Sequence, residues 1–170
     1  MQHNKAGLSH EAFRGVVDGK AVQLYTLINK AGAEAHFINQ GAKLVSLVVP
    51  SRTGYTDVVL GHDSLDEYIH SEEAYFGAIC GRYANRIARG HFTIDGTSYE
   101  LPINNGPNSL HGGLKGFNAV IWDGEELPSP IPPPAAKKVT QASSLYVSST
   151  HSPMKASSAS NTRLRLRVLR

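Results

Sequence analysis

The chain has 170 residues, of which 41% are hydrophobic and 18% charged, enough apolar material for the core of one ordinary domain. No apolar run approaches the roughly 20 residues that span a bilayer, and the N-terminus lacks the basic-then-apolar layout of a secretory signal. The single cysteine, Cys80, cannot form an internal disulfide, and its apolar neighbours favour a buried thiol. These features predict a cytoplasmic protein.

The net charge of +3 conceals two unlike parts of the chain. Residues 1–126 carry all 14 acidic residues and 10 of the 17 lysines and arginines, a balance of −4. Residues 127–170 carry the other seven basic residues and no acidic residue. The basic character therefore belongs to the C-terminal part and does not indicate a nucleic-acid-binding surface on a domain.

In chain order, the first 126 residues are predicted to form short strands and little helix. Gln23–Ile28 and Lys43–Val49 are rich in the β-branched and apolar residues that strands favour. Asp57–Leu60 is predicted to be a third, short strand between two glycines. Leu65–Ile69 suits about one helical turn, for which Ser64 is the candidate N-cap.

A β-hairpin is the strongest local prediction. Its strands would be Phe92–Ile94 and Thr97–Leu101, joined by Asp95-Gly96, a dipeptide that readily adopts the positive φ angles of a two-residue hairpin turn. All 16 glycines of the chain lie in residues 1–126, as expected of a sheet protein with many tight turns. We therefore predict an all-β fold for residues 1–126.

The composition changes abruptly after Glu126. Residues 127–170 hold six of the nine prolines, nine serines and no glycine. The run Pro128–Pro134 favours extended polyproline conformation, and the serine-rich sequence after it offers little apolar surface to offset the entropy of ordering. We expect residues 127–170 to be a disordered, basic tail. Its last segment, RLRLRVLR at 163–170, alternates charged and apolar residues, which fits an edge strand, a nucleic-acid or membrane-surface tail, or a pattern without function.

Three polar residues of the glycine-rich stretch 81–113 are candidate ligand-binding residues. Arg86 carries a rigid fork of donors, and the neighbouring Asn85 offers both a donor and an acceptor. His111 lies between Leu110 and two glycines, where another group can approach closely, and it can exchange a proton near neutral pH. The same residues could equally be a turn cap, a surface ion-pair partner and a loop histidine. No metal-ligand spacing, nucleophile elbow or phosphate loop occurs, so we expect no metal and no cofactor.

The order of these motifs resembles that of the aldose 1-epimerases, also called galactose mutarotases. The resemblance covers residues 12–126 and rests on the following segments: DVVLG at 57–61, YFGAICGRYANRI at 75–87, the hairpin at 92–101, NNG at 104–106, LHGG at 110–113, Phe117 and VIW at 120–122. It implies an antiparallel β-sandwich of the galactose mutarotase-like supersandwich type, here incomplete, with the sugar in an open cleft.

The resemblance also implies a reaction and a set of roles. Family members interconvert the α and β anomers of hexoses such as glucose and galactose, with neither metal nor cofactor. A glutamate base removes the C1 hydroxyl proton while a histidine protonates the ring oxygen, and the opened ring closes as the other anomer. Asn85 and Arg86 correspond to the pair that binds sugar hydroxyls, and His111 to the first active-site histidine, hence a catalytic candidate. The expected partner is a small hexose, with no nucleic acid and no membrane.

The sequence departs from the family pattern after Glu126. The family's general-acid histidine belongs to a later His-x-Tyr-x-Asn-Leu motif, and its base glutamate lies near the end of a longer chain. Here no glutamate follows Glu126, and His151 stands outside any such motif. We expect a truncated, inactive family member, and hypothesise that a frameshift, an unspliced intron or a gene-model error replaced the true continuation. The alternatives are a non-catalytic carbohydrate-binding remnant and a basic-tailed interaction protein, which salt-dependent binding to nucleic acid would reveal.

Overall fold

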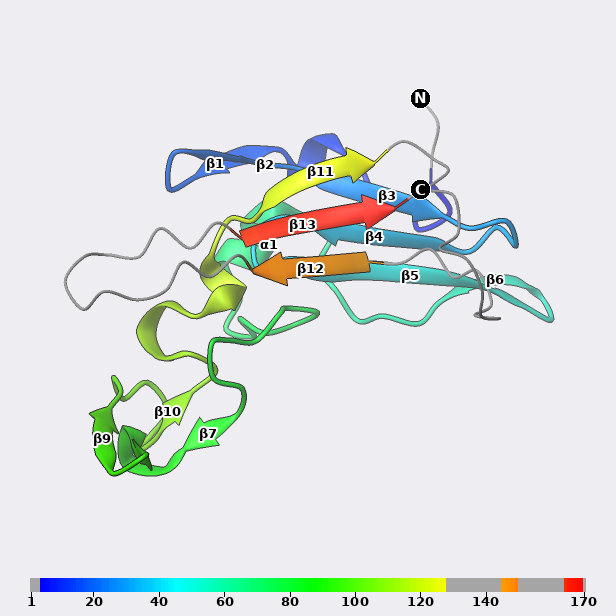
Figure 1. Ribbon diagram of the computed structural model, residues 1–170. Coiled ribbons are helices and arrows are strands. Elements are labelled where there is room, and N and C mark those ends of the chain that lie inside the picture. The colour runs from blue at the N-terminus through cyan, green and yellow to red at the C-terminus, as the bar shows by residue number, and fades with distance from the viewer. Residues whose placement is uncertain (1–3, 128–144, 150–163, 170) are drawn as a thin grey trace.

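Strands dominate the protein, whose computed structural model describes residues 4–127, 145–149 and 164–169. Figure 1 shows a four-stranded sheet, a three-stranded sheet over one of its faces, and a lobe of short strands to one side. Most pairings are antiparallel, which confirms the predicted all-β class.

The central sheet is a meander in which only consecutive strands pair. Its order is β3 (Leu24–Ile28), β4 (Glu34–Ile38), β5 (Lys43–Ser51) and β6 (Gly54–Asp57), all antiparallel. The register shifts between β4 and β5 at a bulge after His36. The two strands predicted at 23–28 and 43–49 are confirmed as β3 and β5.

Alternate residues along a strand point to opposite sides, and β3 to β5 have buried residues on both faces, whereas all four residues of β6 are exposed. On one face, Tyr25, Leu27 and Phe37 pack with Trp122. On the other, the strands are covered by a short 3₁₀ turn, η1 (Glu11–Phe13), and by α1 (Leu65–His70). The buried residues of that second core are Phe13, Leu24, Ile38, Val45 and Tyr68.

The three-stranded sheet lies over the Tyr25 face of the central sheet and has the order β11 (Asp123–Leu127), β13 (Leu164–Leu169), β12 (Leu145–Ser149). The contact is close, since a Cβ on Gly124 would lie 2.1 Å from the Tyr25 hydroxyl. The β11–β13 pair is parallel, an exception to the predicted antiparallel pairing.

Two segments of the expected tail are strands in the structure, while the prediction of a disordered tail from 127 stays a prediction for the rest. Strands β12 and β13 pair with each other and with β11, across the boundary expected at Glu126. A strand edge such as that of β11 is a template for pairing, and the alternating sequence of β13 is typical of a strand. The proline run at 128–134 and the rest of the tail lie outside the described residues.

The lobe carries the glycine-rich stretch that the sequence singled out. In it β8 (His91–Ile94) pairs with β9 (Thr97–Glu100), and β7 (Arg86–Ile87) pairs with β10 (Ser109–Leu110). The predicted hairpin is confirmed, and its turn residues Asp95 and Gly96 have φ of 50° and 76°, as a type I′ turn requires. Five shorter elements complete the described chain: β1 (Gly15–Val17), β2 (Lys20–Val22), and the 3₁₀ turns η2 (Ala88–Gly90), η3 (Gly113–Lys115) and η4 (Phe117–Ala119).

Two further predictions concern the connection after β6. The strand predicted at 57–60 is wrong, because β6 ends at Asp57. The Asp57 Oδ1 accepts hydrogen bonds from the Leu47 and Val59 N–H groups, each at 3.0 Å, and so turns the chain away from the sheet. The helix predicted at 65–69 is confirmed as α1, and the Ser64 Oγ caps it by accepting from the Glu67 N–H at 3.2 Å.

The lobe is fastened to the central sheet through Trp122, which is buried. The Trp122 backbone N–H donates to the Asn39 carbonyl oxygen at 2.9 Å, and the Asn39 Nδ2 donates to the Trp122 carbonyl oxygen at 3.1 Å. Its indole Nε1 donates to the carbonyl oxygen of Phe117 at 3.2 Å. These bonds join the segment that leaves the lobe to the central sheet, as do the hydrogen bonds from the Ile79 N–H to the Gly41 carbonyl oxygen and from the Gly41 N–H to the Val120 carbonyl oxygen.

Candidate functional site

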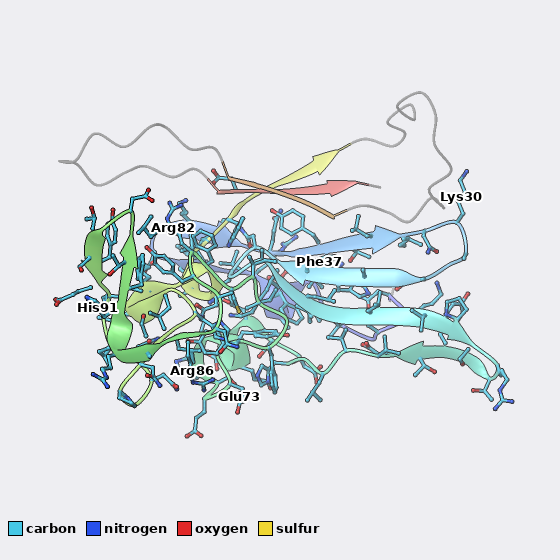
Figure 2. All side chains as sticks on the ribbon, turned by 60° about the horizontal axis from the view of Figure 1, so that its bottom comes forward. Lys30, Phe37, Glu73, Arg82, Arg86 and His91 are labelled. Carbon is cyan, nitrogen blue, oxygen red and sulfur yellow. The ribbon has the colours of Figure 1, made fainter. Side chains whose placement is uncertain are left out.

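The three candidate residues meet where β7 pairs with β10. Arg86 lies opposite Leu110 in this short ladder, so Asn85 and His111 occupy adjoining positions at its end. The His111 N–H donates to the Asn85 carbonyl oxygen at 3.2 Å, which continues the ladder beyond the strands. Residues that are 26 apart in sequence therefore form one cluster. Figure 2 shows Arg86 on this lobe, with Lys30 at the far end of the central sheet.

The backbone of Asn85 determines the tautomer of His111. The Asn85 N–H donates to the His111 Nδ1 at 3.0 Å, so Nδ1 is an acceptor and a neutral ring carries its proton on Nε2. The ring also packs against Tyr75, with the centroids 4.7 Å apart. His111 can therefore donate one hydrogen bond from Nε2 to a ligand oxygen.

Arg86 is held through its Nε. That N–H donates to the Asn105 Oδ1 at 2.8 Å, whereas the two Nη groups have no hydrogen-bond partner among the described residues. The Asn85 Oδ1 accepts from the Arg86 backbone N–H at 2.8 Å, so this oxygen is engaged within the loop and the Asn85 Nδ2 is its remaining donor. Together the cluster presents N–H donors, which suits the lone pairs of hydroxyl and ring oxygens.

The turn after His111 requires its glycines. His111 has a φ of 49° and Gly112 a φ of 96°, both in the left-handed region that is costly for most side chains. A Cβ on Gly112 would lie 2.0 Å from the Gly81 carbonyl oxygen, so the segment at 81 can approach only a glycine. This accounts for the LHGG sequence in physical terms.

The sequence did not reveal the roles of Asn104, Asn105 or Tyr75. Asn104 bonds the backbone on both sides of His111, Asn105 holds Arg86, and Tyr75 packs on the His111 ring. The only signal was the repeated asparagine in NNG, a residue type that often bonds nearby backbone groups. Such a signal does not say which backbone group is bonded.

Two of the buried polar groups in the central sheet, Lys43 and His36, have shifted pKa values. Burial lowers the pKa of Lys43 to about 8, and its ammonium group bonds the Gln40 side chain and lies 5.2 Å from the Tyr68 ring centroid. Burial also lowers the pKa of His36, although Glu34 opposes the shift. In the described part of the chain, no group of three or more metal-binding side chains occurs, and no helix is long and apolar enough to cross a membrane.

The described residues form a predominantly antiparallel β-sheet protein with a polar cluster on its lobe, and comparison with known proteins identifies the family. Residues 23–153, more than half of the chain, match the family model of aldose 1-epimerase. The chain therefore belongs to the aldose 1-epimerase family. The match extends beyond Glu126, where the sequence resemblance was expected to end.

Curated relatives match this chain over only part of their own length. The chain is 56% identical over 86 residues to the galactose mutarotase of Bos taurus, covering 50% of this chain and 25% of the relative. It is 38% identical over 105 residues to the aldose 1-epimerase of Escherichia coli, covering 62% and 30%. The chain thus spans about a quarter to a third of the length of these curated relatives.

Solved structures show the same partial correspondence. The crystal structure of an aldose epimerase homologue from C. elegans matches with a TM-score of 0.57 and 36% identity, over 61% of this chain and 32% of that one. A galactose 1-epimerase from Lactobacillus acidophilus matches with a TM-score of 0.55 and 29% identity, over 64% and 31%. These likenesses confirm the predicted galactose mutarotase-like fold.

Proposed function

We propose that this 170-residue chain binds a hexose through Asn85, Arg86 and His111 but does not accelerate its mutarotation. The observation that supports the binding part is the set of N–H donors that the cluster leaves unengaged: Asn85 and His111 bond each other beside the β7–β10 pair, the His111 Nδ1 and the Arg86 Nε are occupied, and the His111 Nε2 and the Arg86 Nη groups are therefore the donors that remain for a ligand. Hydroxyl-rich ligands offer matching acceptors. The family membership makes a hexose the natural ligand.

The catalytic part of the proposal rests on chemistry that this sequence does not supply. Opening a hexose ring needs a base at the C1 hydroxyl and an acid at the ring oxygen, and each such proton transfer contributes about 10²- to 10⁴-fold. In this role His111 donates a hydrogen bond from Nε2, which orients the sugar. No glutamate follows Glu126, and His151 lies outside the family's histidine motif. The anomers are therefore expected to interconvert at close to the buffer rate.

Two measurements test this proposal. Titration of the chain with D-galactose, followed by NMR, should give weak saturable binding that Arg86→Ala abolishes. Arg52→Ala, which changes an exposed arginine in the turn after β5, is the matched control and should bind as the unsubstituted chain does. Polarimetry of fresh α-D-glucose should show a rate close to that of buffer. A rate typical of the family's enzymes would refute the catalytic part, and equal binding by both arginine variants would refute the site.

A further inference from the structure

Two adjacent asparagines lie behind the candidate site. The Asn104 and Asn105 N–H groups both donate to the carbonyl oxygen of Asn108, at 3.2 and 3.1 Å, and the Asn108 N–H donates back to the Asn105 carbonyl oxygen at 3.0 Å. This small closed loop fixes the backbone of both asparagines. Their side chains then bond two different members of the site.

Asn104 bonds the backbone on either side of His111. Its Oδ1 accepts from the Leu110 N–H at 2.7 Å, and its Nδ2 donates to the carbonyl oxygens of Leu110 and Gly113, both at 3.0 Å. These three bonds use one acceptor and two donors of the amide. They enclose the turn in which His111 has a φ of 49°, a conformation that persists only where surrounding contacts hold it.

Asn105 bonds the side chain of Arg86. Its Oδ1 accepts from the Arg86 Nε at 2.8 Å, and the Asn105 Nδ2 makes no hydrogen bond within the described residues. Arg86 is exposed, and an exposed arginine ordinarily samples many rotamers. A fixed Nε restricts that freedom and directs the Nη groups to one side.

We infer that Asn104 and Asn105 are a pair of positioning residues for the hexose site, Asn104 holding the His111 turn and Asn105 orienting the Arg86 guanidinium. This inference rests on the function proposed above. The two asparagines differ in the atoms they use, because Asn105 needs only an acceptor oxygen whereas Asn104 needs its NH₂ group as well. An aspartate can replace the first but not the second.

Substitution by aspartate therefore separates the two roles. With D-galactose as the probe, Asn105→Asp should keep its affinity within about twofold, while Asn105→Ala should weaken it by about 3- to 10-fold, the cost of ordering one long side chain. Asn104→Asp and Asn104→Ala should both weaken it by about 10-fold or more, since Asp loses the two bonds that Nδ2 donates to the His111 turn and Ala loses all three side-chain bonds. Asn108→Ala is the matched control: among the described residues its Oδ1 accepts one hydrogen bond, from the Arg89 N–H at 3.3 Å, and bonds neither Arg86 nor the His111 turn, so affinity should not change.

Two NMR measurements on the chain without sugar test the positioning roles of Asn104 and Asn105 independently of galactose binding. The Arg86 Nε–H should exchange slowly with water in the unsubstituted chain and in Asn105→Asp, but rapidly in Asn105→Ala. The His111 ring nitrogens should report the Nε2–H tautomer in Asn105→Ala but a mixture in Asn104→Ala. If the unsubstituted chain binds no galactose while these signals behave as stated, the proposed function fails and the positioning pair stands.

Other results would overturn the inference. Fast Arg86 Nε–H exchange in Asn105→Asp would show that the oxygen of residue 105 does not hold Arg86. An unchanged His111 tautomer in Asn104→Ala would remove the role of Asn104. Loss of amide protection throughout the β8–β9 hairpin in Asn104→Ala would make that residue a determinant of folding and would also count against a positioning role.

Discussion

At the residue scale, the bonding of a side chain matters more to this site than its type. His111 becomes a donor at Nε2 because the Asn85 N–H occupies Nδ1, and Arg86 becomes directional because Asn105 occupies its Nε. The sequence could indicate that these polar residues are candidates. It could not indicate the roles of Asn104 and Asn105, because their bonds join groups six to 19 residues apart whose approach depends on the folded loop.

The arrangement of Arg86 leads to a prediction about a substitution that keeps its charge. Arg86→Lys should weaken galactose binding nearly as much as Arg86→Ala, because a single ammonium group cannot bond Asn105 and also present a fork of donors to the sugar. NMR titration of both variants with D-galactose measures this. Arg52→Lys serves as the control, and binding by Arg86→Lys equal to that of the unsubstituted chain would mean that charge alone suffices.

Lys43 leads to a prediction about stability at alkaline pH. Burial lowers its pKa from 10.5 to about 8 in the folded chain, so between these values the unfolded chain binds more protons. The stability of the protein should therefore rise as the pH increases from about 8 to 10.5, by up to about 3 kcal/mol. Lys43→Met should remove this rise.

Urea unfolding of both forms at pH 7, 9 and 10 measures that difference. The comparison isolates Lys43, since Tyr68, whose pKa is raised by burial, titrates in both forms. A parallel pH dependence in the two proteins would show that Lys43 is not the group responsible.

At the scale of single elements, two glycines with positive φ are expected to differ in what they tolerate. A Cβ on Gly96 would meet nothing within 4 Å, whereas one on Gly112 would lie 2.0 Å from the Gly81 carbonyl oxygen. Gly96→Ala should cost only the conformational strain, about 1–2 kcal/mol. Gly112→Ala should cost more than Gly96→Ala and should also displace the backbone at 81. Chemical denaturation gives both costs, and equal values would contradict the close approach at Gly112.

The secondary-structure elements also differ in how well the local sequence predicts them. The β8–β9 hairpin followed from Asp95-Gly96, because the turn itself encodes the pairing of its neighbours. Strand β4 was missed because it contains Glu34 and His36, charged or polar residues that are buried in the fold. Glu34 is tolerated there because Lys5, from the N-terminal segment, bonds it through both its ammonium group at 2.9 Å and its backbone N–H at 2.7 Å. Such a partner lies 29 residues away and leaves no local pattern.

At the scale of the whole molecule, the chain is a sheet with a lobe attached at one end. The family match and the partial coverage of its relatives agree with the family and fold class inferred from the sequence. The three-stranded sheet was not predicted from the sequence. Strand β11 pairs with β13, which follows it only after the proline run and β12, and pairing between segments so far apart in sequence leaves no local pattern. The sugar-binding roles of Asn85, Arg86 and His111 stay predictions that the galactose titrations decide.

The attachment of the lobe through Trp122 has a consequence for the order in which the protein folds. Strands β3 to β6 pair only with their neighbours in sequence, whereas the bonds between Trp122 and Asn39 close a loop of 83 residues. Loop closure costs more entropy as the loop lengthens, and contacts between distant residues form slowly. The central sheet should therefore form first and the indole dock last. Since Trp122 is the single tryptophan, its fluorescence change in stopped-flow refolding should lag behind the far-ultraviolet circular dichroism of the sheet, and simultaneous changes would show that sheet and lobe fold as one unit.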